Sequence, residues 1–374
     1  MENKIVPITL LTGYLGSGKT TLINHVLKNQ DGYKVAVIVN DIGEVNIDAE
    51  LIEKGGVVNE KDDNLVPLTN GCICCTLKVD LMQQIMDIIK TRKFDYILIE
   101  ASGICEPIPI AQTITVLSES TMQYGLPKIC RLDNVVSVVD ALRLASEFGC
   151  GENLVKENID DEDIENLLIQ QIEFCNTLIL NKVDEISKEE LAKVKAIIKK
   201  LQPKATIIET NYGEVDVSKI LNTNLFDFDE ACSSAGWVEE LEKDEDDEHE
   251  ETETEEYGIS SFVYYRRKPI DLEKFKEFLK EYPKNIIRAK GIMWLKGNDE
   301  MSYCFEQAGK QQMITEAGPW IAAEPKYKIE QILSLSEDIR KMWDPECGDK
   351  LNKIVFIGKD LNKQEIIDKL DTMI

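Results

Sequence analysis

The sequence lacks an excess of basic residues, and it lacks any long apolar run. Its 374 residues include 69 acidic and 43 basic side chains, which gives a formal net charge of −26. Proteins that bind DNA or RNA need a basic surface against the phosphate backbone, so nucleic acid is not an expected partner. Because no run of about eighteen apolar residues and no basic and apolar leader occurs, we expect a soluble, cytoplasmic protein with no membrane partner.

Histidine is nearly absent, and the cysteines do not suggest a disulfide framework. Only two histidines occur, His25 and His249, so imidazole can contribute little to a metal site. We expect His25 to be a packing residue on a helix and His249 to belong to a solvated acidic segment. Seven of the ten cysteines stand alone, whereas Cys72, Cys74 and Cys75 form one cluster. In a reducing compartment such a cluster favours metal binding or catalysis over cross-linking.

Short β-branched runs alternate with helical patterns from Ile5 to about Leu221. This alternation is typical of βαβ units, so we predict a doubly wound, mostly parallel α/β domain over residues 1–222. The expected strands are 6–11, 35–39, 96–99, 135–139, 177–180 and 206–208, and the expected helices are 19–28, 77–91, 164–174 and 188–201.

An acidic stretch separates this domain from the rest of the chain. Residues 239–256 contain thirteen acidic side chains and one lysine among eighteen positions. Self-repulsion and the lack of apolar side chains predict a disordered linker, which we assign to residues 223–256. Beyond it, strands are expected at 259–265, 286–295 and 354–357, and helices at 271–280 and 364–370. These patterns predict a smaller α+β domain over residues 257–374.

The segment GYLGSGKT, from Gly13 to Thr20, matches the P-loop pattern in full, directly after an apolar strand and before a helix. Backbone N–H groups of such a loop and the positive end of the following helix surround phosphate groups. We expect Lys19 to reach the β- and γ-phosphate oxygens and Thr20 to bind Mg²⁺. The P-loop NTPase fold is therefore predicted, with nucleotide contacts from Gly13, Gly16, Ser17, Gly18, Lys19, Thr20 and Thr21.

Two further strand ends carry residues that fit a nucleotide site. Glu100 ends an apolar strand and is expected to orient water or a Mg²⁺ ligand, while the N–H of Gly103 would meet the γ-phosphate. Asn181, Lys182 and Asp184 follow the strand expected at 177–180. The carboxylate of Asp184 can accept hydrogen bonds from N1–H and the N2 amino group of guanine, a donor pair that adenine lacks. GTP is therefore expected in preference to ATP.

The cysteine cluster places three thiols within four positions, at Cys72, Cys74 and Cys75, after an extended segment and before a helix. Thiolates favour Zn²⁺, Cu⁺ or iron–sulfur chemistry over Mg²⁺ or Ca²⁺. Three sulfurs and one further ligand would complete a tetrahedral zinc site. Structural cysteines or a redox pair are the alternatives to a metal site.

Together, these motifs and the segment RAKGIMW that begins at Arg288 make the sequence similar to the CobW family of P-loop GTPases. The family includes zinc-allocating metallochaperones, cobalamin-biosynthesis proteins and nitrile hydratase activators. The likeness covers nearly the whole chain, because the region after Tyr257 resembles the C-terminal domain of the family. It implies GTP hydrolysis with Mg²⁺, in which Lys19 and Glu100 are the catalytic candidates.

The resemblance also implies a metal cargo and a client metalloprotein. Cys72, Cys74 and Cys75 become the ligands of Zn²⁺, with Co²⁺ or Fe²⁺ as alternative cargoes. Residues 40–44 are similar to the first switch segment of the family, so Glu44 is a further candidate for sensing the nucleotide or giving an oxygen to the metal. Rival interpretations are a plain GTPase switch with structural cysteines and a metal sensor that binds nucleotide without turnover. The client, the fourth metal ligand and the oligomeric state stay open.

Overall fold

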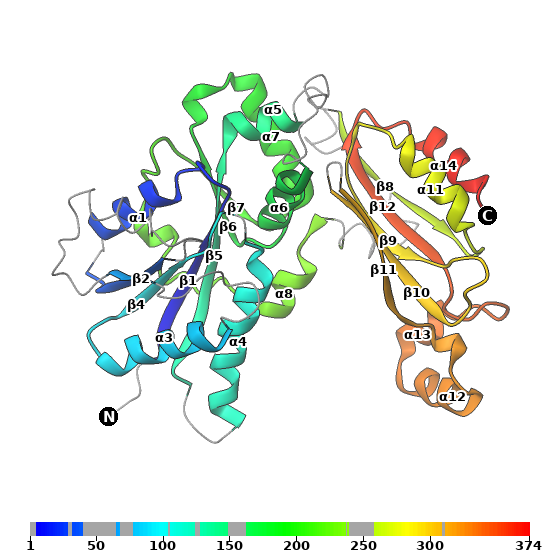
Figure 1. The fold of residues 1–374 in the computed structure, drawn as a ribbon, viewed down its shortest axis with the longest axis horizontal. Helices are drawn as coiled ribbons and strands as arrows, with labels where there is room; N and C mark the ends of the chain where they lie inside the picture. The colour runs from blue at the N-terminus through cyan, green and yellow to red at the C-terminus, as the bar shows by residue number, and fades with distance from the viewer. Residues whose placement is uncertain are drawn as a thin grey trace. The chain divides into compact units, whose positions relative to one another are not determined.

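The computed structural model describes residues 5–28, 32–39, 65–67, 78–103, 105–123, 128–148, 162–236, 238, 258–308 and 311–374. The chain divides into two compact units, and the main boundary follows Gly236 (Figure 1). None of the helices in the described residues is long and apolar enough to cross a membrane.

A parallel sheet of seven strands forms the centre of the first unit, in the order β3-β2-β4-β1-β5-β6-β7. Residues of β2, β4 and β6 are buried along the whole of each strand, as expected for a parallel sheet with helices on both faces. The predicted doubly wound fold is confirmed. The strands are β1 (Val6–Thr12), β2 (Val35–Val39), β3 (Leu65–Pro67), β4 (Tyr96–Glu100), β5 (Cys130–Asp140), β6 (Thr177–Asn181) and β7 (Thr206–Glu209).

Helices follow most of these strands, and Figure 1 shows them on both sides of the sheet. The four predicted helices are present within a few residues of their expected bounds, whereas α4, α5 and α8 were not predicted. The helices of this unit are α1 (Lys19–Lys28), α3 (Lys78–Thr91), α4 (Pro107–Gln123), α5 (Ala141–Phe148), α6 (Glu162–Glu173), α7 (Lys188–Leu201) and α8 (Phe228–Ser233), with 3-10 turns η2 (Val183–Glu185) and η3 (Val217–Lys219).

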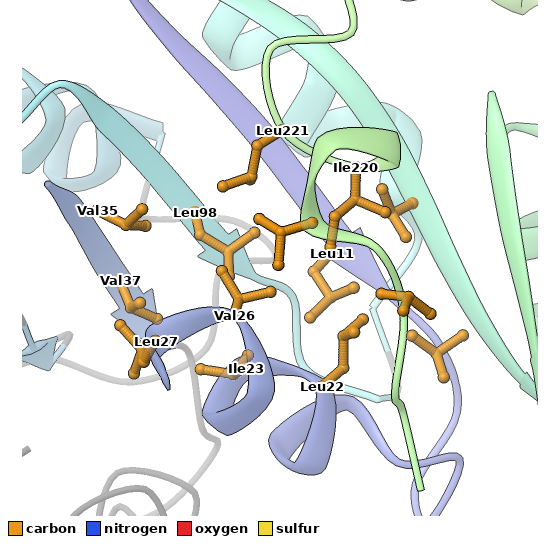
Figure 2. Packing of buried hydrophobic residues seen from close by; sticks show 14 of the residues in the cluster. Leu11, Leu22, Ile23, Val26, Leu27, Val35, Val37, Leu98, Ile220 and Leu221 are labelled. Atoms are coloured by element: carbon orange, nitrogen blue, oxygen red, sulfur yellow. The ribbon is translucent and has the colours of Figure 1, made fainter. Parts of the chain in front are cut away.

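The helix that follows the P-loop is held by the core of this unit. Figure 2 shows Leu22, Ile23 and Val26 of α1 in one buried cluster with Leu11 of β1 and Leu98 of β4. All five side chains are at most 2% exposed. Burial of each such side chain contributes about 1.5–3 kcal/mol, so the first turn of α1 is rigidly attached to the sheet.

Residues 223–236 were predicted to belong to the linker, but the structure groups them with the first unit. The backbone N–H groups of Leu225 and Phe226 donate to the Asp133 carbonyl at 3.0 Å, and the rings of Phe226 and Phe228 contact Phe174. Two aromatic side chains therefore pack residues of the predicted linker against Phe174, which directly follows α6. The acidic positions 239–256 of the predicted linker lie outside the described residues.

The second unit is an antiparallel sheet of five strands in the order β11-β10-β9-β12-β8. Its core lies between the sheet and two helices and contains Phe262, Phe275, Phe305, Phe356 and Leu370. The C-terminal α+β domain is therefore present. Its strands are β8 (Ile259–Arg266), β9 (Ile286–Met293), β10 (Met301–Ala308), β11 (Gln311–Pro319) and β12 (Asn352–Lys359), and its helices are α11 (Leu272–Lys280), α12 (Lys326–Leu335), α13 (Glu337–Met342) and α14 (Lys363–Asp371), with the 3-10 turn η4 (Ile321–Ala323).

Candidate nucleotide site

The carboxyl ends of β1, β4, β5 and β6 meet at one edge of the parallel sheet, and the residues with nucleotide-binding motifs follow these ends. Register pairs Leu11 with Glu100, and Asp140 with Asn181, across neighbouring strands. Ligands of open α/β sheets bind at the carboxyl ends of the strands, at the point where the strand order reverses. The topology therefore brings together motifs that are far apart in the sequence.

Three glycines of the P-loop have positive φ angles, at Gly13 (+137°), Gly16 (+78°) and Gly18 (+108°). A Cβ on Gly13 would lie 2.3 Å from the Val138 carbonyl oxygen, and a Cβ on Gly18 would lie 2.3 Å from Asn181 Nδ2. A Cβ on Gly16 would meet nothing within 4 Å among the described residues. The loop is thus packed against the sheet at two glycines and faces open space at the third, which is where a phosphate group can approach the backbone.

Lys19 begins α1, and its side chain folds back over the P-loop. Its Nζ atom donates to the carbonyl oxygens of Gly13 at 2.8 Å and Tyr14 at 3.4 Å, and the residue is only 7% exposed. A phosphate oxygen is a stronger acceptor for an ammonium group than a carbonyl, because the hydrogen bond is then charged on both sides. The Lys19 ammonium is already held at the mouth of the loop.

Hydroxyl groups surround the loop. Thr12, Ser17 and Ser137 are each at most 2% exposed, and their hydroxyl oxygens have no hydrogen-bond partner among the described residues. Thr12 pairs with Ser137 across β1 and β5, next to Gly13. Thr20, in the first turn of α1, is partly buried, and Thr21 is exposed. A polar lining, an ammonium group and a helix N-terminus fit a phosphate ligand.

The segment that follows β4 lies against the P-loop. Glu100 is 1% exposed, and the N–H of the next residue, Ala101, donates to the Leu11 carbonyl at 2.8 Å. A Cβ on Gly103 would lie 2.8 Å from the backbone nitrogen of Leu15, so only glycine allows this approach. Glu100 and Gly103, predicted from sequence spacing alone, are therefore neighbours of the P-loop.

The segment from Asn181 to Asp184 lies on the other side of the loop. Asn181 is 3% exposed, donates through Nδ2 to the Ser17 carbonyl at 2.8 Å, and accepts through Oδ1 from Gly213 N at 3.2 Å. Lys182 adopts a left-handed conformation with φ +61°, and Asp184, the middle residue of η2, is exposed. Asn181 therefore holds the P-loop through a hydrogen bond, while Asp184 is exposed and accessible to a nucleotide base.

Two residues at this edge were missed by the sequence analysis. Asp140, at the end of β5, forms an ion pair with Lys182, and the Arg143 guanidinium lies 4.2 Å from the centre of the Tyr14 ring. Neither residue belongs to a motif with a fixed spacing. The only sequence signal is their position directly after a buried strand of a parallel sheet, where ligand-binding residues gather.

The thiolate cluster and Glu44 lie outside the described residues. Within the described part of the chain, no group of three or more His, Cys, Asp or Glu side chains is arranged to hold a metal ion. Burial raises the pKa of Cys130 and of Cys175 to about 12, so both thiols are neutral and poor metal ligands. His25 Nε2 lies 2.7 Å from the Val215 carbonyl oxygen, as expected of a packing residue.

Comparisons with known proteins show which family this sequence resembles. Residues 7–209 match the family described as "CobW/HypB/UreG, nucleotide-binding domain", and residues 259–374 match "Cobalamin synthesis protein cobW C-terminal domain". "Zinc-regulated GTPase metalloprotein activator 1" of Dictyostelium discoideum is 35% identical over 97% of this chain and 78% of its own length. The protein of the same name in Schizosaccharomyces pombe is 30% identical over 96% and 83%.

A bacterial relative matches over a smaller share of this chain. "Zinc chaperone YjiA" of Escherichia coli is 29% identical over 78% of this chain and 83% of its own length. The two family matches together span both units, and the relatives align over most of the sequence. The chain therefore belongs to the CobW family, with a CobW/HypB/UreG nucleotide-binding domain followed by a CobW C-terminal domain.

Proposed function

We propose that this protein is a GTPase metallochaperone, which binds zinc through Cys72, Cys74 and Cys75 and delivers it to a client metalloprotein under the control of GTP. One observation carries the nucleotide part of the proposal. Asn181 donates a hydrogen bond to the phosphate loop, in which Gly16 is accessible. The exposed Asp184 belongs to the same four-residue motif as Asn181. The names of the relatives, zinc-regulated GTPase metalloprotein activator and zinc chaperone, support the metal part.

At the phosphate end, we assign the contacts to the P-loop backbone from Gly13 to Gly18, and to Lys19. Moving the Lys19 ammonium from the Gly13 carbonyl to a phosphate oxygen requires only a side-chain rotation, because both lie at the mouth of the loop. Mg²⁺ held through Thr20 would neutralise charge on the phosphates, and Glu100 would orient water or a Mg²⁺ ligand. Gly103 approaches the loop at Leu15 and would offer its N–H to the γ-phosphate.

At the base end, we assign guanine recognition to Asp184. Its backbone N–H donates to Asn211 Oδ1 at 3.2 Å, and the residue is exposed. The same turn carries Lys182, whose left-handed backbone and ion pair with Asp140 hold the loop in place. A preformed carboxylate favours guanine because the two adjacent donors of guanine are satisfied together.

The metal part of the proposal rests on the cysteine sequence and on the relatives. The chain leaves the cysteine cluster directly into α3, and α3 leads into β4, whose end delivers Glu100 and Gly103 to the P-loop. A γ-phosphate that orders this segment would therefore alter the geometry of the thiolates. The coupling must be reciprocal, so if GTP tightens zinc binding, zinc tightens GTP binding by the same factor.

The decisive experiment measures bound metal, nucleotide affinity and GTP hydrolysis on one purified protein kept reduced. We expect stoichiometric zinc and GTP turnover in the unmodified chain. Serine at Cys72, Cys74 and Cys75 should abolish zinc retention and leave GDP affinity within a few-fold. Lys19→Ala should lower GTP affinity roughly 10- to 100-fold, because it removes a charged hydrogen bond of about 1.5–3 kcal/mol.

Two control variants make this experiment specific. Serine at Cys304 and Cys347, two partly exposed thiols outside the cluster, should leave the zinc content unchanged. A protein that hydrolyses GTP but retains no transition metal would be a plain GTPase switch. A protein that binds metal and GTP without turnover would be a sensor. Cobalt or iron in place of zinc would keep the metallochaperone and change its cargo.

A further inference from the structure

The start of α5 lies between the two loops of the proposed GTP site. Asp140 is the last residue of β5, and each of its carboxylate oxygens makes one contact. Its Oδ2 atom pairs with Lys182 Nζ, and its Oδ1 atom accepts from the backbone N–H of Arg143 at 3.2 Å. The N-terminus of α5 is therefore attached to the guanine-reading loop through one carboxylate.

The side chain of Arg143 reaches the opposite loop. Its guanidinium carbon lies 4.2 Å from the centre of the Tyr14 ring, within the range of a cation–π contact. The Tyr14 carbonyl in turn accepts from Ser17 N at 3.2 Å and from Lys19 Nζ at 3.4 Å. The Tyr14 carbonyl thus accepts the hydrogen bond that closes the turn of the P-loop and a second hydrogen bond from the Lys19 ammonium, which also donates to Gly13.

Tyr14 lies between Gly13 and Gly16, two residues with positive φ angles and no side chains to restrict the backbone when the loop is not folded. An anchor on the Tyr14 ring limits the orientations that this part of the loop can take. Pre-ordering a phosphate loop reduces the conformational entropy that must be lost when the nucleotide binds.

We propose that Arg143 is a positioning residue that connects the phosphate loop to the guanine-reading loop through the start of α5. The inference rests on the proposed GTP site. Guanine bound at Asp184 orders the turn that holds Lys182, Lys182 holds Asp140, and Asp140 and Arg143 together hold Tyr14. Base binding and phosphate binding then support each other through this chain of contacts.

The test is a double-mutant cycle on the dissociation constant of a fluorescent GDP analogue. Arg143→Ala and Tyr14→Leu should each weaken binding roughly fivefold, the value expected from a cation–π contact that is partly shielded from water. The double variant should be no weaker than either single variant. Arg143→Lys, which keeps the cation, should recover most of the affinity, whereas Arg143→Gln should not.

A second cycle tests transmission through the helix. Asp140→Asn keeps a capping oxygen and removes the ion pair with Lys182. When Arg143 is present, the effects of Asp140→Asn and Tyr14→Leu on GDP affinity should be non-additive. When Arg143 is replaced by alanine, the two effects should add. Lys195→Ala is the control for Arg143→Ala: it removes a positive charge from α7, where the lysine pairs with Glu209, and should leave affinity unchanged.

The outcomes separate the two proposals. A chain that fails to bind GDP at all overturns the proposed function, and this inference with it. A chain that binds GDP, with Arg143→Ala and Tyr14→Leu additive or without effect, overturns the inference alone. Affinities are compared only between variants whose thermal unfolding midpoints lie within about 2 °C of the parent protein. If Arg143→Ala is unstable, the GDP affinities of Arg143→Lys and Arg143→Gln are compared instead.

Discussion

Gly18→Ala should destabilise the first unit far more than an ordinary glycine substitution. The φ angle of +108° at Gly18 is strained for alanine, which costs about 1–2 kcal/mol. In addition, the new Cβ would lie 2.3 Å from Asn181 Nδ2, so the buried Asn181 side chain must move. Its hydrogen bonds to the Ser17 carbonyl at 2.8 Å and from Gly213 N at 3.2 Å would then be lost.

Each lost hydrogen bond costs about 1 kcal/mol, so the free energy of unfolding should fall by about 3–4 kcal/mol in total. Gly16→Ala is the matched control. Gly16 also has a positive φ angle, +78°, but its Cβ would meet nothing within 4 Å among the described residues. It should therefore cost only the backbone strain, about 1 kcal/mol. Urea unfolding in the absence of nucleotide, monitored by circular dichroism, measures the free energy of unfolding of both variants.

The difference between the two variants is the quantity that tests the reasoning. If Gly18→Ala and Gly16→Ala lower the free energy of unfolding equally, Asn181 does not brace the loop as described. The same variants should separate in binding. Gly16→Ala places a methyl group where a phosphate would approach, so its GDP affinity should fall although its stability is nearly preserved.

Three further predictions concern other parts of the first unit. Asp184→Asn should weaken GTP binding about 30- to 100-fold in competition assays, and it should favour xanthosine triphosphate, because the new amide donates where the carboxylate accepted. Asp133→Ala should lower the free energy of unfolding by about 3–5 kcal/mol, because the buried carboxylate accepts from Thr223 N and Asn224 N at 2.9 Å, whereas Thr223→Ala keeps the backbone donor and should cost less. Burial raises the pKa of Cys175 from 9.0 to about 12, so the thiol ionises at a lower pH in the unfolded chain than in the folded one. The stability that the neutral, buried thiol contributes below pH 9.0 is therefore lost as the pH rises above that value. The stability gap between the parent protein and Cys175→Ala should narrow from pH 8 to pH 10 in urea unfolding, and a constant gap would contradict the shifted pKa.

The strands of the parallel sheet were recognised because of where they lie. Strands such as β2, β4 and β6 are covered on both faces, so they appear in the sequence as uninterrupted apolar runs. In the second unit, β10 and β11 were missed. β11 is an edge strand of the antiparallel sheet and β10 is its neighbour, and polar residues such as Ser302 and Glu306 interrupt the pattern of β10. A half-exposed edge strand carries a weaker pattern than a buried central strand.

The linker boundary shows a second limit of sequence patterns. Composition correctly marks residues 239–256 as acidic, but it does not show where the preceding chain stops packing. That point depends on the contacts of Phe226 and Phe228 with Phe174, a residue far away in the sequence. Long-range aromatic contacts of this kind have no local signature.

The sequence by itself determined the chemistry of the candidate site. Glycine spacing, one lysine, and carboxylates at strand ends are local features, because each specifies a backbone conformation or a charge at a fixed distance along the chain. Tertiary structure decided which of them act together. Asn181 meets Ser17 across 164 residues, and Arg143 meets Tyr14, only because the register of parallel strands brings their ends to one edge. Strand register follows from the packing of the whole core, so no single motif can specify it.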